Sequence, residues 1–189
     1  LLVLGAAGGV GLAAVELGKV AGARVIAAVS SEGKAAVARA HGADATLVYP
    51  STVTDPRALT AAFKDACGPS GADVIYDPVG GPYAEPALRA IAWEGRYLVV
   101  GFPAGIPQPP LNLALLKGCD ICGVFWGSFV ERNPARHREH VKNLLQMCLE
   151  GRIRPEISAR YPLERGGEAL EALAGRHATG KVVVTIGEG

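Results

Sequence analysis

The sequence predicts an α/β protein in which a parallel, doubly wound sheet of six strands is covered by helices on both faces. Short apolar runs alternate with segments of helical periodicity from the first residue to about Gly151. Most of the runs are apolar at consecutive positions, which is typical of strands buried on both faces. Six strands in this alternation predict the spatial order 3-2-1-4-5-6.

The first three strands are each followed by a segment with one apolar helical face. We expect these strands at Leu1 to Leu4, Arg24 to Val29 and Thr46 to Tyr49. A helix ending at Gly22 follows the first strand, and Lys34 to His41 form a second helix. Asp55 is the expected cap and Pro56 the first residue of a third helix. The apolar faces of the first and third helices are Val10, Ala13, Ala14, Leu17 and Ala21, and Leu59, Ala62, Phe63 and Ala66.

The second half of the alternation continues in the same way. A fourth strand is expected at Asp73 to Tyr76 and a helix at Pro86 to Trp93. The remaining elements are a fifth strand at Arg96 to Val100, a loop at Phe102 to Pro110, helical turns at Leu111 to Lys117 and a sixth strand at Ile121 to Trp126. A long helix follows, with Val141, Leu144, Leu145 and Cys148 on one face and its end at Gly151.

The C-terminal residues depart from this alternation of strands and helices. Ile153 to Leu163 have an extended pattern, Glu168 to Ala174 a helical one, and Lys181 to Ile186 form a β-branched strand. We therefore expect one domain at residues 1–151 and a tail at 152–189. The chain opens inside a strand, without methionine or a signal sequence, and we expect it to be a piece of a longer protein. The alternative is a small complete domain that has been trimmed.

Composition excludes several classes of partner. The formal net charge is +1, which gives no electrostatic basis for binding nucleic acid or an anionic membrane. No apolar run reaches the roughly 18 residues that a bilayer span requires. The four cysteines occur without a secretory context, so we expect a cytoplasmic protein with reduced thiols.

The strongest motif is Gly5-Ala6-Ala7-Gly8-Gly9-Val10-Gly11, between the first strand and the first helix. Free backbone N–H groups and the positive end of the helix dipole favour an anion there, and glycines let the backbone approach phosphates. Gly8 and Gly11 occupy the second and third positions of the G-x-G-x-x-G pattern, and Ala6 occupies the first. The motif predicts a Rossmann domain whose cofactor pyrophosphate lies at Ala7 to Gly11; the alternative is a tight turn without a ligand.

The same motif, continued through Leu12-Ala13, resembles the cofactor loop of the medium-chain dehydrogenase/reductase superfamily. The Ala-Ala pair before the glycines resembles its zinc-independent quinone oxidoreductase branch. The resemblance extends from residue 1 to about residue 186. It is also carried by Gly42-Ala43-Asp44, Asp77-Pro78-Val79-Gly80-Gly81, Gly95-Arg96-Tyr97, Gly101-Phe102, Val124-Phe125-Trp126-Gly127 and Thr179-Gly180-Lys181-Val182-Val183.

The resemblance implies an oxidoreductase that transfers hydride from NADPH to a quinone, an enone or a related activated alkene. It also implies a GroES-like catalytic domain before the glycine motif, absent from this sequence, to which the tail would return. Two alternatives stay open, namely an enoyl-thioester reductase module of a larger synthase and a non-catalytic sensor module that binds NADPH.

The choice between NADPH and NADH is made after the second strand, where the adenosine ribose lies. The sequence there is Ser30-Ser31-Glu32-Gly33-Lys34, with no carboxylate at the first two positions. Lys34 offers a charge and Ser30 a hydroxyl to a 2′-phosphate. The resemblance implies that Lys34 and Tyr49 contact this phosphate, so we predict NADPH. Glu32 could bind the ribose instead, and Lys34 could be a solvated helix residue.

No residue pattern identifies a catalytic side chain or a metal. Cys119 and Cys122 are three apart at the sixth strand, so they should point to opposite faces and cannot share a metal. The histidines, including His41 and His177, form no catalytic pattern. Hydride transfer needs no protein nucleophile. The resemblance places Val79, Gly101, Phe102, Phe125 and Trp126 around the nicotinamide and ribose, beside a small electrophilic substrate; ordinary interface packing is the alternative for Phe125 and Trp126.

The sixth strand is expected at an edge of the sheet, where its backbone groups lack partners. Its residues Asp120 to Phe125 are mostly apolar. We therefore expect a homodimer in which two copies of this strand pair antiparallel about a twofold axis, as in the family that the chain resembles. The alternative is a monomer whose edge is covered by Lys181 to Ile186 or by the absent domain.

Overall fold

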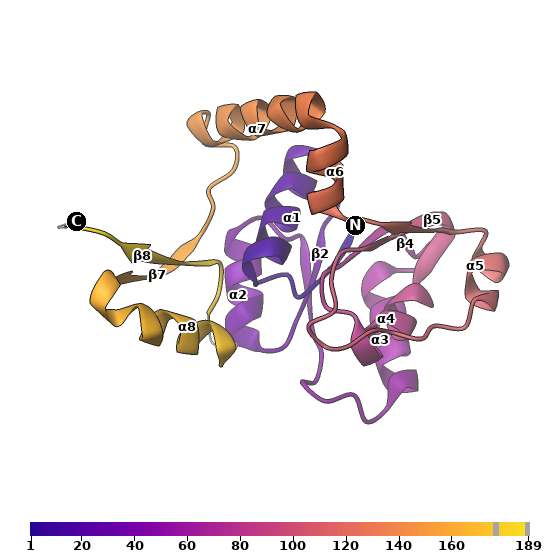
Figure 1. Ribbon diagram of the computed structural model, residues 1–189. Helices are drawn as coiled ribbons and strands as arrows, with labels where there is room; N and C mark the ends of the chain where they lie inside the picture. Colours follow the sequence, from indigo (N-terminus) through magenta and orange to yellow (C-terminus); the bar gives the residue numbers. More distant parts are fainter. Residues whose placement is uncertain (176–177, 188–189) are drawn as a thin grey trace.

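The computed structural model describes residues 1–175 and 178–187, and its largest element is a six-stranded parallel sheet (Figure 1). The strand order is β3-β2-β1-β4-β5-β6, which confirms the predicted order. All five neighbouring pairs are parallel. The strands are β1 (Leu2–Leu4), β2 (Ile26–Val29), β3 (Ala45–Val48), β4 (Ala72–Asp77), β5 (Ile91–Val99) and β6 (Asp120–Gly123).

Helices cover both faces of this sheet, because successive side chains of a buried strand point to opposite sides. Val3 packs with residues of α1 (Gly9–Val20) and α2 (Glu32–Ala40). Its neighbours Leu2 and Leu4 pack with Phe63 of α3 (Pro56–Cys67) and with α4 (Ala84–Leu88). β1 and β2 are buried along their whole length, as predicted for central strands. No helix in the described part of the chain is both long and apolar enough to span a membrane.

Local capping fixes where two of these helices begin. The Asp55 carboxylate accepts hydrogen bonds from the backbone N–H groups of Arg57 (2.9 Å) and Ala58 (3.0 Å), and Pro56 is the first residue of α3. This confirms the predicted cap. Ser31 caps α2 in the same way, since its hydroxyl accepts from the Lys34 N–H at 3.3 Å. α2 therefore begins two residues before the predicted Lys34.

The predicted helix at Pro86 to Trp93 is wrong in its second half. α4 ends at Leu88, and Ile91 to Trp93 belong to β5. The cause is tertiary: Ala72 pairs with Ile91, and the Ala72 N–H donates to the Ala90 carbonyl at 3.0 Å. The register then shifts before Val74, where Glu94 takes a positive φ of 57°. A bulge of this kind lets a strand bend while it stays paired.

The predicted sixth strand is also too long. β6 ends at Gly123, and Trp126 begins a short helix, α6 (Trp126–Arg132), that the sequence analysis did not predict. The Val124 N–H still donates to the Val99 carbonyl at 2.8 Å, after which the chain leaves the sheet. α5 (Asn112–Lys117) and α7 (Pro134–Leu149) confirm the predicted helical turns and long helix.

The buried face of α1 differs from the predicted one. The buried residues are Gly11, Leu12, Val15 and Gly18, whereas Val10 is 49% exposed. Glycines lie where α1 is closest to its neighbours, because a Cβ on Gly11 would meet the backbone of Gly5 and Ala6 after β1. Ala13 and Leu17, predicted to face the core, line a second cavity of about 250 Å³ together with Leu144 and Cys148 of α7.

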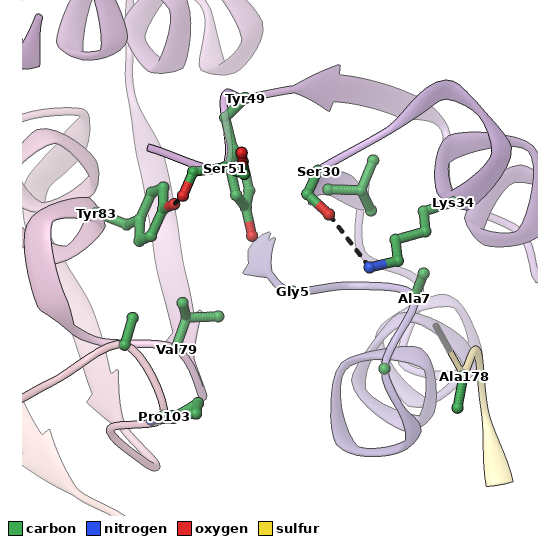
Figure 2. Close-up of a pocket in the computed structure, with 13 residues that line it drawn as sticks. Gly5, Ala7, Ser30, Lys34, Tyr49, Ser51, Val79, Tyr83, Pro103 and Ala178 are labelled. Carbon is green, nitrogen blue, oxygen red and sulfur yellow. Dashed lines mark hydrogen bonds between the residues drawn. The ribbon is translucent and has the colours of Figure 1, made fainter. Parts of the chain in front are cut away.

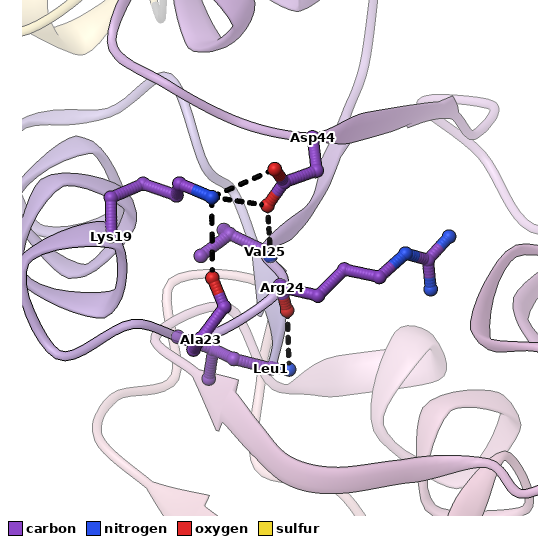
Figure 3. Close-up of polar contacts among 6 residues, drawn as sticks. All are labelled: Leu1, Lys19, Ala23, Arg24, Val25 and Asp44. Carbon is purple, nitrogen blue, oxygen red and sulfur yellow. Dashed lines mark hydrogen bonds and ion pairs between the residues drawn. The ribbon is translucent and has the colours of Figure 1, made fainter.

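An ion pair connects α1 with the residues that precede β2 and β3, at the amino ends of these strands (Figure 3). The Lys19 ammonium donates to both carboxylate oxygens of Asp44, at 2.7 and 2.8 Å. The same carboxylate accepts from the Val25 N–H at 2.7 Å. The hydrogen bond from Lys19, followed by that from Val25, lowers the pKa of Asp44. Asp44 of the Gly42-Ala43-Asp44 motif therefore serves the fold rather than the ligand end of the sheet.

The tail forms a separate unit, drawn in yellow beside the sheet in Figure 1. β7 (Ile157–Pro162) pairs in parallel with β8 (Lys181–Thr185), and α8 (Gly166–Ala174) packs on both strands. The extended, helical and extended pattern predicted for the tail is thus confirmed. β8 pairs with β7 and not with β6, so among the described residues no strand pairs with the outer edge of β6.

Candidate cofactor site

The glycine turn leaves backbone N–H groups without intrahelical acceptors at the start of α1. Gly5 has a φ of +57°, and the chain turns so that the Gly8 N–H donates to the Gly5 carbonyl at 3.0 Å. The first bond of the helix runs from Leu12 to the Gly8 carbonyl at 2.8 Å, so the N–H groups of Gly9 to Gly11 have no acceptor within the helix. No side chain in the described part of the chain caps this end, and its first turn contains no acidic residue. These features favour an anion.

The glycines of the turn have different steric roles. A Cβ on Gly11 would lie 2.3 Å from the Gly5 carbonyl oxygen and 2.8 Å from the Ala6 Cα, so Gly11 permits the contact between α1 and the turn that follows β1. A Cβ on Gly8 would lie 3.4 Å from its nearest neighbour, which is an ordinary contact. Ala6 is fully buried, and the sharp turn is made by Gly5 before it. This explains why alanine is tolerated at the first position of the pattern.

A cavity of about 360 Å³ opens beside this turn at the carboxyl ends of β1, β2, β3 and β4 (Figure 2). Its volume is within the range of small-molecule sites, and it can hold part of a dinucleotide. The cavity joins residues from four strand ends to one residue of the tail. It is lined by Gly5, Ala7, Gly8, Val29, Ser30, Lys34, Tyr49, Ser51, Val79, Tyr83, Pro103, Ala104 and Ala178.

Among the described residues that line the cavity, Lys34 carries the positive charge. Its ammonium donates to the Ser30 hydroxyl at 3.2 Å, and Figure 2 shows both side chains on the same side of the cavity. Glu32, the other candidate for contact with the ribose, does not line the cavity. Its side chain is 82% exposed and its carboxylate lies 3.9 Å from the Arg39 guanidinium.

The opposite wall is aromatic. The rings of Tyr49 and Tyr83 are tilted with centroids 4.8 Å apart, and Phe63 extends the cluster at 6.5 Å from Tyr49. The Tyr83 hydroxyl donates to the backbone carbonyls of Pro50 (3.1 Å) and Ser51 (2.7 Å), which fixes the loop after β3. Burial raises the pKa of Tyr49 to about 12, although a hydrogen bond with the Gly5 backbone opposes this shift. Tyr49 is therefore neutral at physiological pH and lies close to the glycine turn.

A buried carboxylate shapes the loop after β4. Asp77 is 3% exposed and accepts from the N–H groups of Val79 and Gly80, both at 2.8 Å. It also accepts from the Tyr97 hydroxyl at 2.5 Å, and burial together with this carboxylate raises the pKa of Tyr97. Val79 is thereby held against the turn, since a Cβ on Gly5 would lie 2.8 Å from a Val79 methyl.

The structure gathers only some of the predicted cofactor residues in this cavity. Ala7, Gly8, Ser30, Lys34, Tyr49 and Val79 line it, and Gly9 to Gly11 form the adjoining start of α1. Gly101, Phe102, Phe125 and Trp126 do not line it; Phe125 and Trp126 are 76% and 67% exposed. Sequence analysis missed Ser51, Tyr83, Pro103, Ala104 and Ala178. The first four adjoin predicted loops, but nothing in the sequence indicates that Ala178 returns to the glycine turn.

The cysteines and histidines occupy separate places. Cys119 is buried and Cys122 half-buried. Within residues 1–175 and 178–187, no group of three or more His, Cys, Asp or Glu side chains is arranged to hold a metal ion. His41 contacts Glu16, His137 lies edge-on to Trp126 and His140 stacks on Phe129. His177 lies outside the described residues.

Comparison with known proteins gives a consistent result. A family model described as zinc-binding dehydrogenase matches residues 9–149. Quinone oxidoreductase-like protein 2 of Bos taurus is 36% identical over 98% of this chain and 52% of its own length. Acryloyl-coenzyme A reductase of Metallosphaera sedula is 29% identical over 98% of this chain and 50% of its length. The chain thus spans about half the length of the curated relatives it matches.

A solved structure shows the same fold. A mycobacterial protein complexed with NADPH superimposes with a TM-score of 0.85 at 26% identity, over 97% of this chain and 56% of the other. The match covers nearly all of this chain, so the tail unit, like the six-stranded sheet, has its counterpart in that protein.

Proposed function

Because this chain belongs to the zinc-binding dehydrogenase family, within the medium-chain dehydrogenase/reductase superfamily, we propose that it is the NADPH-binding half of a reductase. The substrates of the whole protein are quinones, enones or related activated alkenes. One observation carries the proposal: the uncapped start of α1 lies beside a cavity that holds Lys34. The uncapped start of α1 suits a pyrophosphate, and Lys34 suits a 2′-phosphate.

The residues of the site favour NADPH over NADH. Lys34 and Ser30 both line the cavity and offer a cation and a hydroxyl to a 2′-phosphate, whereas Glu32 lies outside the lining, near Arg39. None of the described residues that line the cavity has a carboxylate, the group that would accept from both ribose hydroxyls and favour NADH. The NADPH complex of the mycobacterial protein supports the same choice.

In this proposal the chain binds NADPH and orients its nicotinamide. The N–H groups of Gly9 to Gly11 would hold the pyrophosphate, and Val79 with the loops after β5 and β6 would extend the surface toward the nicotinamide. When bound, the nicotinamide supplies a hydride to an electrophilic carbon. The other wall of the substrate site belongs to the unmatched half of the relatives, and the proton comes from solvent or from that half.

Steady-state turnover of the full-length protein, with NADPH and a panel of quinones, enones and enoyl thioesters, tests this function. Quinone or enone reduction supports the proposal. Reduction confined to enoyl thioesters would favour the alternative module, which the likeness to acryloyl-coenzyme A reductase supports. Tight NADPH binding without turnover across the panel would identify a sensor module instead.

The Lys34→Ala change should weaken the binding of NADPH selectively. A lost charge-assisted contact with a phosphate costs about 1.5–3 kcal/mol, so the preference for NADPH over NADH should fall roughly tenfold or more. Titration of both cofactors, followed by nucleotide fluorescence, measures the ratio. Lys142→Ala, on the exposed surface of α7, is the control and should leave the ratio unchanged. An equal loss of affinity for both cofactors would show that Lys34 does not contact the 2′-phosphate.

We also propose that two copies pair through β6. This strand is at the edge of the sheet and is not covered by β8. Since Val124 donates inward to Val99, the N–H groups of Ile121 and Gly123 point to the open edge by the alternation of a strand. An antiparallel pair of β6 strands would extend the sheet across both copies.

If two copies pair through β6, a proline in this strand should prevent the pairing. Gly123→Pro removes an outward donor at a position where a Cβ meets nothing within 4 Å, so the monomer should fold and the dimer dissociate. Light scattering at micromolar concentration gives the mass, and circular dichroism checks the fold. Val124→Pro is the contrasting variant, because it removes the bond to Val99 inside the sheet and should lower stability. A wild-type monomer, or a Gly123→Pro dimer, would contradict the proposal.

A further inference from the structure

Two segments of the tail contact the Rossmann domain and lie side by side. One is residues 153–156, which lead into β7, and the other is residues 178–181, here called the strap. The Lys181 N–H donates to the Glu156 carbonyl at 2.7 Å. Gly180 has a φ of +67°, and a Cβ on it would lie 2.6 Å from the same carbonyl oxygen. The strap is therefore packed against its neighbour at backbone distance.

The strap also contacts the glycine turn directly. The Gly180 N–H donates to the Ala7 carbonyl at 3.0 Å, and Gly180 forms a parallel bridge with Gly8. A Cβ on Gly9 would lie 2.9 Å from the Gly180 carbonyl oxygen, so the two backbones touch at that point as well. Ala178 lines the candidate cofactor cavity, as Figure 2 shows. One end of the strap is thus a wall of the site.

This contact fixes the peptide group between Ala7 and Gly8 at both ends. Its carbonyl accepts from Gly180, and its N–H donates to the Gly5 carbonyl at 3.0 Å. The next carbonyl, that of Gly8, accepts from Leu12 and starts the helix. The direction of the free N–H groups of Gly9 to Gly11 depends on this peptide plane. The strap therefore supports the donors that the pyrophosphate would use.

The neighbouring segment is anchored independently. Nδ1 of His41 lies 2.8 Å from a Glu16 carboxylate oxygen, and Nε2 lies 3.4 Å from a Glu156 carboxylate oxygen. The Arg154 N–H donates to the same Glu16 oxygen at 3.1 Å. Glu16 and His41 are 10% and 13% exposed, so this anchor is largely shielded from water. Because the strap is bonded to Glu156, a shift of the strap must disturb either this anchor or the glycine turn.

We propose that Gly180 is a positioning residue of the cofactor site and that the strap couples cofactor binding to the tail unit. This inference rests on the proposed binding of NADPH. Gly180 does not touch the cofactor; it holds the Ala7–Gly8 peptide in the orientation that presents the helix donors. Coupling is reciprocal, so the cofactor should in turn hold the strap on the turn.

The variant that tests this role is Gly180→Ala. The added methyl meets the Glu156 backbone and strains a left-handed residue, so the strap must move away from Ala7 or Glu156. We expect NADPH affinity to fall at least about fivefold, the lower end of typical coupling between sites. Gly187→Ala is the matched control, since Gly187 has a φ of +90°, lies in the same unit and has nothing within 4 Å of its Cβ position.

A second measurement on the wild-type chain separates positioning from a merely structural role. Hydrogen exchange with and without NADPH should show that the strap amide of Gly180 becomes more protected when NADPH is added, while Gly187 does not. If wild type fails to bind NADPH, the proposed function is wrong and this inference with it. If wild type binds NADPH, but Gly180→Ala binds equally well or the strap exchanges at the same rate in both states, the positioning role alone is overturned.

Discussion

Replacing Gly8 with valine should abolish the binding of NADPH and leave the sheet folded. Gly8 has φ −76° and ψ 163°, which any residue adopts, and its Cβ position meets only the Gly5 carbonyl oxygen at 3.4 Å. The free chain therefore has room for a side chain. Gly8 is exposed and lines the cavity, so the valine methyl groups would occupy space that the phosphates must enter. Nucleotide fluorescence measures the affinity, and circular dichroism checks the fold.

The control for this variant is Gly167→Val. Gly167 is exposed in the first turn of α8, and nothing lies within 4 Å of its Cβ position, but it is not part of the cavity. It should bind NADPH like wild type. An undiminished affinity in a folded Gly8→Val protein would remove the glycine turn from the cofactor site and, with it, the basis of the proposed function.

The Gly11→Ala variant should lose stability by about 1–3 kcal/mol, and more if the backbone cannot adjust. Its methyl would lie 2.3 Å from the Gly5 carbonyl oxygen, and both nearest groups are backbone atoms of the turn. Helix α1 must then move away from the turn that follows β1, which also displaces the donors of the proposed phosphate site. The midpoint of urea denaturation measures the change in the free energy of unfolding.

The expected loss of stability is opposite to the usual effect, because alanine inside a helix normally stabilises by up to about 1 kcal/mol relative to glycine. Gly33→Ala provides that comparison: Gly33 is in α2 and nothing lies within 4 Å of its Cβ position. We expect Gly33→Ala to be neutral or stabilising and Gly11→Ala to be destabilising. Equal stability of Gly11→Ala and wild type would mean that α1 is not in backbone contact with Gly5 and Ala6 of the turn.

The sequence by itself determined the features that depend on local patterns. Consecutive apolar residues gave the buried strands, and the alternation with helices gave the strand order 3-2-1-4-5-6. The Asp55-Pro56 pair predicted the start of α3, because capping depends on neighbouring residues alone. The position of the glycine turn was predicted for the same reason. So was the place of Lys34 near it, since the ends of adjacent parallel strands meet at one edge of the sheet.

Only the tertiary structure decided which side of α1 is buried and where β5 begins. The helix is rich in alanine and glycine, so its apolar pattern is weak, and the contact of Gly11 with the Gly5 carbonyl sets its rotation. Ile91 to Trp93 are extended because Ala72 pairs with Ile91, a partner 19 positions away along the chain. The strap was beyond sequence analysis for the same physical reason. Its bond from Gly180 to Ala7 joins the two ends of the chain, and no local periodicity records such a contact.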